Sequence, residues 1–185
     1  STLTSINILS EMAAMQTKRS PVVAEEYMLK ISKNSSDMMQ AMDDIVWSIK
    51  PANDNLGKVV ARMREYMGAV LESKGIDCRF KITDQIEKSK LSMEQRKGVF
   101  LVYKEAVNNI AKYANASEVD VKINIDAGVL SMSIEDNGIG IPSLRLRNGN
   151  GLDNMQQRIE QLKGIFHISS LEGKGTTISF SININ

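Results

Sequence analysis

The sequence is poor in the residues that build disulfide frameworks and multi-histidine metal sites. Its 185 residues include one cysteine, Cys78, and one histidine, His167. A lone cysteine excludes an internal disulfide framework and a cysteine-rich metal site, and a lone histidine leaves little material for a Ser-His-Asp relay. Both residues fall in strand-like segments. We expect Cys78 to be buried there, because free cysteine mostly behaves as a small hydrophobe, and we expect His167 to pack in a sheet.

The sequence also lacks a large net charge and long apolar runs. Its formal net charge is +1, so no strong field steers the protein toward nucleic acid or a membrane surface. No apolar run approaches the roughly 20 residues needed to span a bilayer, and no signal peptide is visible. We therefore expect a cytoplasmic, globular protein that contacts neither nucleic acid nor a membrane. The hydrophobic content of 42% suits a globular fold.

The first 50 residues have the spacing of apolar residues that is typical of helices, and they show no strand-like alternation. Thr17–Pro21 reads as a turn between two amphipathic helices, with Ser20 as N-cap and Pro21 at the first helical position. Pro51 ends the second helix. Such a hairpin leaves an apolar face exposed, so we expect a second copy to cover it and to form a dimeric four-helix bundle. Residues 1–50 are thus predicted to be a dimerisation hairpin.

Residues 51–185 are predicted to form a second domain in which helices and strands alternate. Ser92 and Gln95 make a capping box that opens a helix running to about Ala114. Five segments read as strands, and apolar and polar residues alternate clearly in three of them, 77–83, 119–125 and 129–135. The fold class is therefore α+β, with helices on one face of a mixed, mostly antiparallel sheet. The expected elements are helices over 56–74, 92–114 and 151–163, and strands over 77–83, 119–125, 129–135, 165–169 and 176–182.

The first candidate site motif is a polar row on the helix expected over 92–114. Glu105 and Asn109 are four residues apart and share one helical face, and Lys112 follows one turn later. A carboxylate, a carboxamide and an ammonium group in one row suit a magnesium-triphosphate, because Mg²⁺ prefers few, hard oxygen ligands. An ordinary solvated helix face is the alternative interpretation.

The second and third motifs are rich in glycine. Asp136, Gly138 and Gly140 follow a strand, where a carboxylate can accept a hydrogen bond from the adenine amino group. A tight turn is the alternative. Gly149 and Gly151 precede a helix, whose N-terminal N–H groups can bind phosphate, unless they only form a flexible loop. The segment between Pro142 and Asn148, with Arg145 and Arg147, is either a lid over the phosphates or a solvated loop.

Taken in order, these motifs resemble the nucleotide-binding boxes of the GHKL ATPase superfamily, which includes sensor histidine kinases, DNA gyrase, mismatch-repair ATPases and a ninety-kilodalton chaperone. The resemblance covers roughly residue 51 to the C-terminus. A helical hairpin before a compact nucleotide module selects the histidine kinases, and residues 44–54 are similar to the corresponding junction of nitrate-sensor, LytS-like and DesK-like kinases. The motifs are Glu105-x-x-x-Asn109, Asp136-x-Gly138-x-Gly140, Gly149-x-Gly151-Leu152 and Gly175-Thr176.

The resemblance implies ATP and Mg²⁺ as cofactors and assigns a role to each motif. Asn109 would hold Mg²⁺, Asp136 would bind adenine, and Thr176 would lie near the base. Glu105 matches the position that activates water in hydrolytic relatives. The remaining nucleotide-binding candidates are Lys112, Gly138, Gly140, Gly149, Gly151 and Leu152.

The resemblance also implies a homodimer that passes phosphate from ATP to a histidine and then to an aspartate on a response regulator receiver domain. The acceptor histidine is expected just upstream of Ser1, so this chain is not expected to phosphorylate itself. The parent would be cytoplasmic or the cytoplasmic part of a membrane-anchored sensor. Two alternatives stay open: a GHKL ATPase or serine kinase of another branch, and a degenerate module used only for dimerisation.

Overall fold

The computed structural model describes residues 2–83, 86–87, 89–141 and 150–184, and the chain falls into two compact units, Ser1–Ile49 and Lys50–Asn185. The first unit is a helical hairpin of α1 (Thr2–Gln16) and α2 (Pro21–Ile49). Ala13 and Ala24 are its buried apolar residues, because small side chains let the two helices approach closely. In the described ranges, no helix has both the length and the apolar character needed to cross a bilayer.

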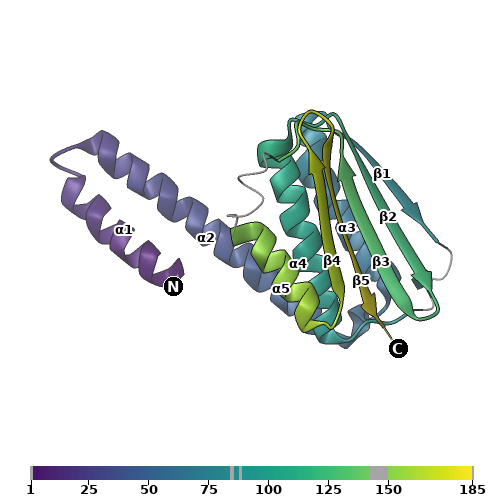
Figure 1. Ribbon diagram of the computed structural model, residues 1–185. Helices are drawn as coiled ribbons and strands as arrows, with labels where there is room; N and C mark the ends of the chain where they lie inside the picture. Colours follow the sequence, from purple (N-terminus) through teal and green to yellow (C-terminus); the bar gives the residue numbers. More distant parts are fainter. Residues whose placement is uncertain (1, 84–85, 88, 142–149, 185) are drawn as a thin grey trace. The chain divides into compact units, whose positions relative to one another are not determined.

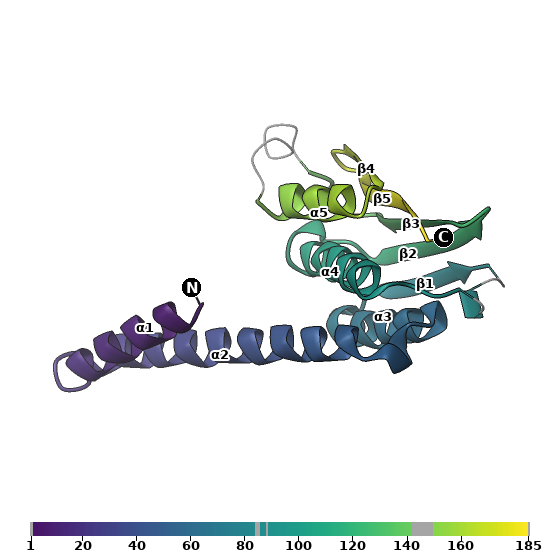
Figure 2. The ribbon, with the colours of Figure 1, turned by 90° about the horizontal axis from the view of Figure 1, so that it is seen from below.

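The second unit is a layer of helices on a mixed sheet. Among the described residues, the sheet has five strands in the order β1-β2-β3-β5-β4. Its β1 pairs with β2 in parallel and the other neighbours are antiparallel, and Figures 1 and 2 show the helices on one face. The α+β prediction is therefore confirmed. The elements are α3 (Leu56–Leu71), β1 (Asp77–Ile82), α4 (Met93–Asn109), β2 (Glu118–Asp126), β3 (Val129–Asp136), α5 (Asn150–Gln161), β4 (Ile165–Leu171) and β5 (Gly175–Asn183).

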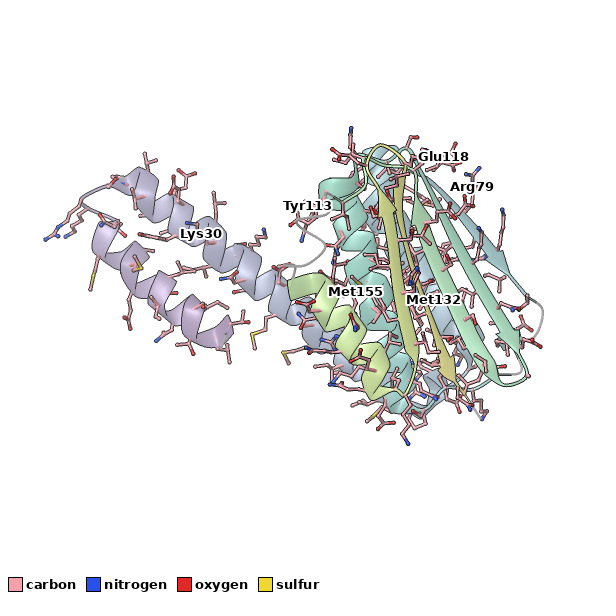
Figure 3. All side chains as sticks on the ribbon, in the orientation of Figure 1. Lys30, Arg79, Tyr113, Glu118, Met132 and Met155 are labelled. Atoms are coloured by element: carbon pink, nitrogen blue, oxygen red, sulfur yellow. The ribbon has the colours of Figure 1, made fainter. Side chains whose placement is uncertain are left out.

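The core of this unit lies between the helices and the inward side chains of the sheet. Strands β2 and β3 alternate between buried and more exposed residues, as expected for a sheet with one covered face. Met132 of β3 and Met155 of α5, labelled in Figure 3, are both almost fully buried. The hydroxyl of the buried Tyr103 in α4 donates to the Met63 carbonyl of α3 at 2.8 Å and ties two helices of the layer together.

Two predicted local structures differ in detail from the structure. The capping box is present, with the Ser92 hydroxyl accepting from the Gln95 N–H, and the helix reaches Ala114 as predicted, but its last turn is not α-helical. It continues beyond Asn109 as a π-helical turn, η4 (Ile110–Ala114). His167 lies in a strand, as expected, but the prediction that it packs in the sheet is wrong: it is exposed, because residues of one parity in β4 face solvent.

Candidate nucleotide site

The first turn of α5 lies directly over the polar row of α4. A Cβ atom added at Gly151 would lie 2.6 Å from Oε1 of Glu105 and 3.8 Å from Nδ2 of Asn109. Glu105 and Asn109 therefore share one helical face, and that face points at the start of α5. Glycine presents no side chain there, so backbone N–H groups at this helix terminus can approach a phosphate together with a carboxamide and a carboxylate.

The Asp136–Gly140 turn is docked on the end of η4. The Ile139 N–H donates to the Ala114 carbonyl at 2.7 Å. A Cβ at Gly138 would collide with the same carbonyl, so any other residue would push the turn away from the helix. Gly140 meets the β4–β5 turn at Leu171. Since η4 begins one residue after Asn109, a single continuous helix borders both groups of candidate residues.

Asp136 is buried at the end of β3, with 5% of its surface exposed. Burial raises the pKa of its carboxyl group, and hydrogen bonds from the backbone N–H groups of Gly138 and Thr176 partly offset that rise. The Gly138 N–H donates to Oδ1 at 2.9 Å. Each carboxylate oxygen can accept more than one hydrogen bond. A desolvated carboxylate held in this way can therefore read a donor such as an exocyclic amino group.

Thr176 stands beside Asp136 in the sheet. The two are register partners across β3 and β5, and Ser170 of β4 is the partner of Thr176 on its other side. The Thr176 hydroxyl lies 3.0 Å from the Ser170 hydroxyl. Asp136 and Thr176, which the sequence placed in separate motifs, are thus adjacent on the helix-covered face of the sheet.

The remaining candidate residues either have no described contact with the residues above or lie outside the described residues. Lys112 is exposed on η4, and Leu152 is half-buried in the first turn of α5. Gly149, like the arginine-containing segment proposed as a lid, lies outside the described residues. Among the residues that are described, no three His, Cys, Asp or Glu side chains cluster in a way that could hold a metal ion. A carboxamide ligand such as Asn109 suits Mg²⁺, which takes few protein ligands.

Two polar residues that the motifs did not single out organise the site. Asn137 accepts hydrogen bonds at Oδ1 from the N–H groups of Ser117 and Glu118, at 2.9 and 3.0 Å, and so ties the turn to the start of β2. Ser170 accepts from the Ile141 N–H at 2.7 Å. A sequence signal for Ser170 exists, because period two places it on the same face of β4 as the apolar Phe166 and Ile168.

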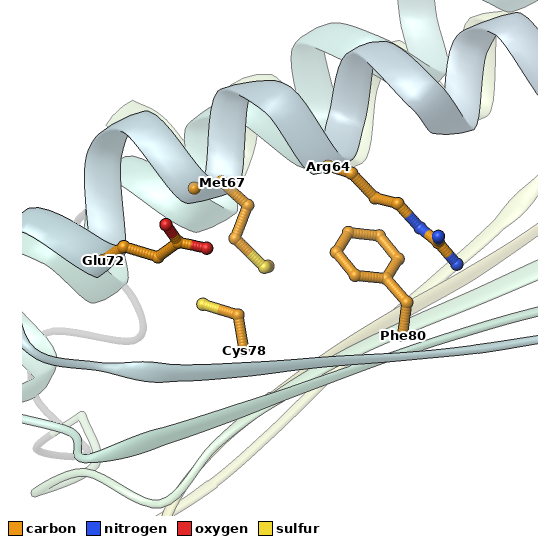
Figure 4. Close-up of a pocket in the computed structure, with 6 residues that line it drawn as sticks. Arg64, Met67, Glu72, Cys78 and Phe80 are labelled. Atoms are coloured by element: carbon orange, nitrogen blue, oxygen red, sulfur yellow. The ribbon is translucent and has the colours of Figure 1, made fainter.

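A separate hollow of about 340 Å³ lies between α3 and β1, at the edge of the sheet, as Figure 4 shows. Its lining includes Arg64, Glu72 and Phe80, with the half-buried Cys78 thiol, whose pKa is raised by burial. None of the candidate nucleotide-binding residues lines it. The described candidate residues lie instead on α4, η4, α5 and the turns and strands beside them.

Comparison with known proteins agrees with the geometry. Residues 94–185 match the family described as histidine kinase-, DNA gyrase B-, and HSP90-like ATPase. The chain is 37% identical over 109 residues to the signal transduction histidine-protein kinase/phosphatase UhpB of Salmonella typhimurium, covering 59% of this chain and 21% of that protein. It is 34% identical over 134 residues to DegS of Brevibacillus brevis, also a signal transduction histidine-protein kinase/phosphatase, covering 72% and 34%. The chain thus spans between a fifth and about a third of these relatives' length.

Solved structures show the same fold. The histidine kinase domain of the Erythrobacter litoralis blue-light activated histidine kinase matches with a TM-score of 0.66 at 15% identity, covering 97% of this chain and 94% of that one. The Acinetobacter baumannii histidine kinase AdeS matches with a TM-score of 0.67 at 17% identity, covering 98% and 96%.

Proposed function

We propose that this chain is the dimerisation and ATP-binding core of a two-component kinase, because residues 94–185 match the histidine kinase-, DNA gyrase B-, and HSP90-like ATPase family and the chain has the fold of solved histidine kinase structures. It would bind Mg-ATP, direct the γ-phosphoryl group to a histidine, and serve a response regulator whose aspartate receives the phosphate. Domain boundaries at residue 50, with the hairpin for dimerisation and residues 51–185 for nucleotide binding, are part of this proposal.

One observation carries the proposal: the first turn of α5 at Gly151 lies over Glu105 and Asn109, within 2.6 Å of Glu105 Oε1 and 3.8 Å of Asn109 Nδ2 as measured from the Cβ position. A helix N-terminus held against a carboxylate and a carboxamide suits a metal-bound triphosphate. The helix N-terminus attracts the negative phosphates, and the side-chain oxygens attract the positive metal ion. Bound Mg-ATP supplies the phosphoryl group and the positive charge that balances it. Asn109 would contribute a metal ligand. Glu105 would contribute a carboxylate that orients the attacking group or accepts a proton from it. Asp136 holds the base.

Removing the Asn109 carboxamide tests this assignment. We expect Asn109→Ala to reduce the gain in ATP affinity that Mg²⁺ provides by about tenfold, which corresponds to about 1.4 kcal/mol, because a direct metal ligand is lost. ATP is titrated calorimetrically into each protein, once with Mg²⁺ and once with EDTA. The ratio of the two affinities is the quantity compared.

Asn108→Ala is the matched control, because Asn108 is the adjacent carboxamide but accepts from the Tyr66 hydroxyl of α3 at 2.8 Å. Its Mg²⁺ dependence should equal that of the unaltered chain. The metal-ligand role of Asn109 is wrong if both variants, or neither, lose the Mg²⁺ effect.

The hairpin is proposed to form a homodimer through exposed apolar side chains of α2. Met42 and Ile49 are 56% and 51% exposed and lie on one helical stripe, in which the spacing of three, four or seven residues keeps side chains on one face. A free hairpin of this size cannot bury such a stripe within itself. The stripe consists of Met39, Met42, Ile45, Val46 and Ile49.

We expect Met42→Glu to shift the chain from dimer to monomer, because a charge would be buried in the apolar interface. Multi-angle light scattering over a range of protein concentrations measures the change. Lys33→Gln, which alters net charge by the same amount on an exposed residue away from the stripe, should leave the dimer intact. A monomer at every concentration of the unaltered chain would refute this interface.

A further inference from the structure

The edge strand β1 has backbone groups that no described strand uses. Within the described ranges, β1 pairs with β2 alone. The Asp77 N–H donates to the Ser117 carbonyl at 2.9 Å, and the Thr83 N–H, just after the strand, donates to the Ile123 carbonyl at 3.3 Å. Odd-numbered residues of β1 therefore direct their N–H groups at β2. Because these directions alternate along a strand, the backbone groups of the even-numbered residues point away from β2, toward an edge that can pair with another strand.

The helix-covered side of β1 is also only half closed. Its inward side chains, Cys78, Phe80 and Ile82, are all half-buried. Their register partners on β2 include Val119 and Val121, which are completely buried. The hollow between α3 and β1 reaches Cys78 and Phe80. A further strand beside β1 would cover the inward side chains that the helices leave half open.

The hollow carries one charge at each end. The Arg64 guanidinium lies 5.2 Å from the centroid of the Phe80 ring. The Glu72 carboxylate folds back over Gly68, where an added Cβ would lie 3.3 Å from its Oε1. Burial, and after it the charge of Glu72, raises the pKa of the Cys78 thiol, and Figure 4 shows Glu72 on the same side of the hollow as Cys78. Among the residues that the structure describes, neither charged group forms an ion pair.

These two charges define the chemistry of a strand that would fit. A side chain beside Cys78 would meet the Glu72 carboxylate, and a side chain beside Phe80 would meet Arg64. Two such side chains are two residues apart, or about 6.6 Å, and share one face of a strand. We propose that β1 is a docking edge for an extended segment of a partner protein, which adds beside β1 and places a basic and an acidic side chain, two residues apart, at the hollow. Main-chain hydrogen bonds would hold this segment, and the two charges would select it.

A second copy of β1 fits this edge less well. The inward residues of the strand carry no charge, so they would leave both ends of the hollow unpaired. Antiparallel pairing of two copies about Phe80 would also set Arg79 of one copy opposite Lys81 of the other. Like charges directly opposite one another destabilise a sheet. The charges of the edge therefore favour a segment of a different protein.

Binding of synthetic peptides to the full chain tests this proposal. The probe is a capped, dye-labelled peptide of about eight threonine and valine residues, in which a lysine and a glutamate stand two positions apart, and fluorescence anisotropy reports binding. Peptides with two lysines or two glutamates at these positions should bind about tenfold more weakly, because one attractive pair becomes repulsive. Absence of binding by the lysine–glutamate peptide would overturn the proposal.

Reversing one charge of the hollow should invert the preference. In Arg64→Glu, the peptide with two lysines should bind about tenfold more tightly than the lysine–glutamate peptide, and unfolding cannot produce such a gain. Lys174→Glu is the matched control, because it makes the same charge change on an exposed residue after β4, at the opposite edge of the sheet. Inversion in both variants, or in neither, would overturn the selection by charge.

Methylation of peptide N–H groups separates strand pairing from simple charge attraction. Methyl groups on every second residue should abolish binding in one register and preserve it in the other, because only alternate N–H groups face β1. Loss in both registers, or in neither, would overturn strand addition. Peptide binding that weakens as the protein concentration rises would identify a second copy as the occupant and overturn the partner segment. None of the residues involved belongs to the candidate nucleotide site, so these results do not depend on ATP binding.

Discussion

Labelled Mg-ATP is expected to leave no acid-labile, base-stable phosphate on this chain. His167, the one histidine in the sequence, is exposed in β4. Its register partner is Ser179, which places it on the side of the sheet opposite to Asp136, Thr176 and the covering helices. Phosphoryl transfer needs the nucleophile about 3 Å from phosphorus and in line with the leaving group. A missing nucleophile cannot be replaced by good positioning of the nucleotide.

The measurement is label retained per chain after base treatment, with ATP binding verified separately. His167→Gln should behave as the unaltered chain does. A stoichiometric label that this substitution abolishes would overturn both the prediction and the placement of the site. A helix that carries a histidine, fused ahead of Ser1, is the positive control and should become labelled.

Loss of the Asp136 charge is expected to give the largest fall in ATP affinity. A hydrogen bond to a charged group contributes about 1.5–3 kcal/mol, so Asp136→Asn should weaken ATP binding by roughly tenfold to a hundredfold. Glu135→Gln is the control of equal charge, because Glu135 is exposed and faces Lys122 at 3.4 Å. Unchanged affinity in Asp136→Asn would remove this carboxylate from the site.

The same substitution should raise the stability of the nucleotide-free protein at neutral pH. Burial raises the pKa of Asp136 in the folded state, so ionisation of this carboxyl group opposes folding, and its cost appears as pH rises through the folded pKa. Asn carries no such charge. The gain in the unfolding midpoint should therefore be present at neutral pH and vanish below the ordinary carboxyl pKa, where Asp136 is protonated in both states. A gain independent of pH would contradict this account.

Local chemistry made much of the fold predictable. The capping box at Ser92 and the proline at the start of α2 act within a few residues, and both helices begin where the sequence indicates. The strand order was not predictable, because period two says which face a residue occupies but not which strand lies beside it. The placement of β5 between β3 and β4 depends on packing across the whole sheet.

The sequence predicted the motif residues of the candidate site, but it did not predict the contacts among them. The glycines and acidic residues of the motifs can be recognised from their spacing in the sequence. Ser170 can be recognised only from its register with Thr176 in the sheet. The exposure of His167 was mispredicted because apolar neighbours suggested burial, although those neighbours point to the other face. The π-helical turn was missed because five residues of wider helix do not disturb an apolar pattern enough to be seen.

That π-helical turn constrains how the chain can change in length. A π-helical turn holds about one residue more than an α-helical turn, so deleting one residue between Asn109 and Ala114 would let the segment rewind as α-helix with the Ala114 carbonyl at nearly the same angle. Each α-helical residue adds a rotation of about 100°, so an insertion or a longer deletion would swing that carbonyl away from the Ile139 N–H. The base-binding turn would lose its anchor although no ligand-contacting side chain had been altered. Insertions and longer deletions should accordingly be excluded from this stretch during evolution, whereas a single deletion and substitutions at the exposed Tyr113 should be tolerated.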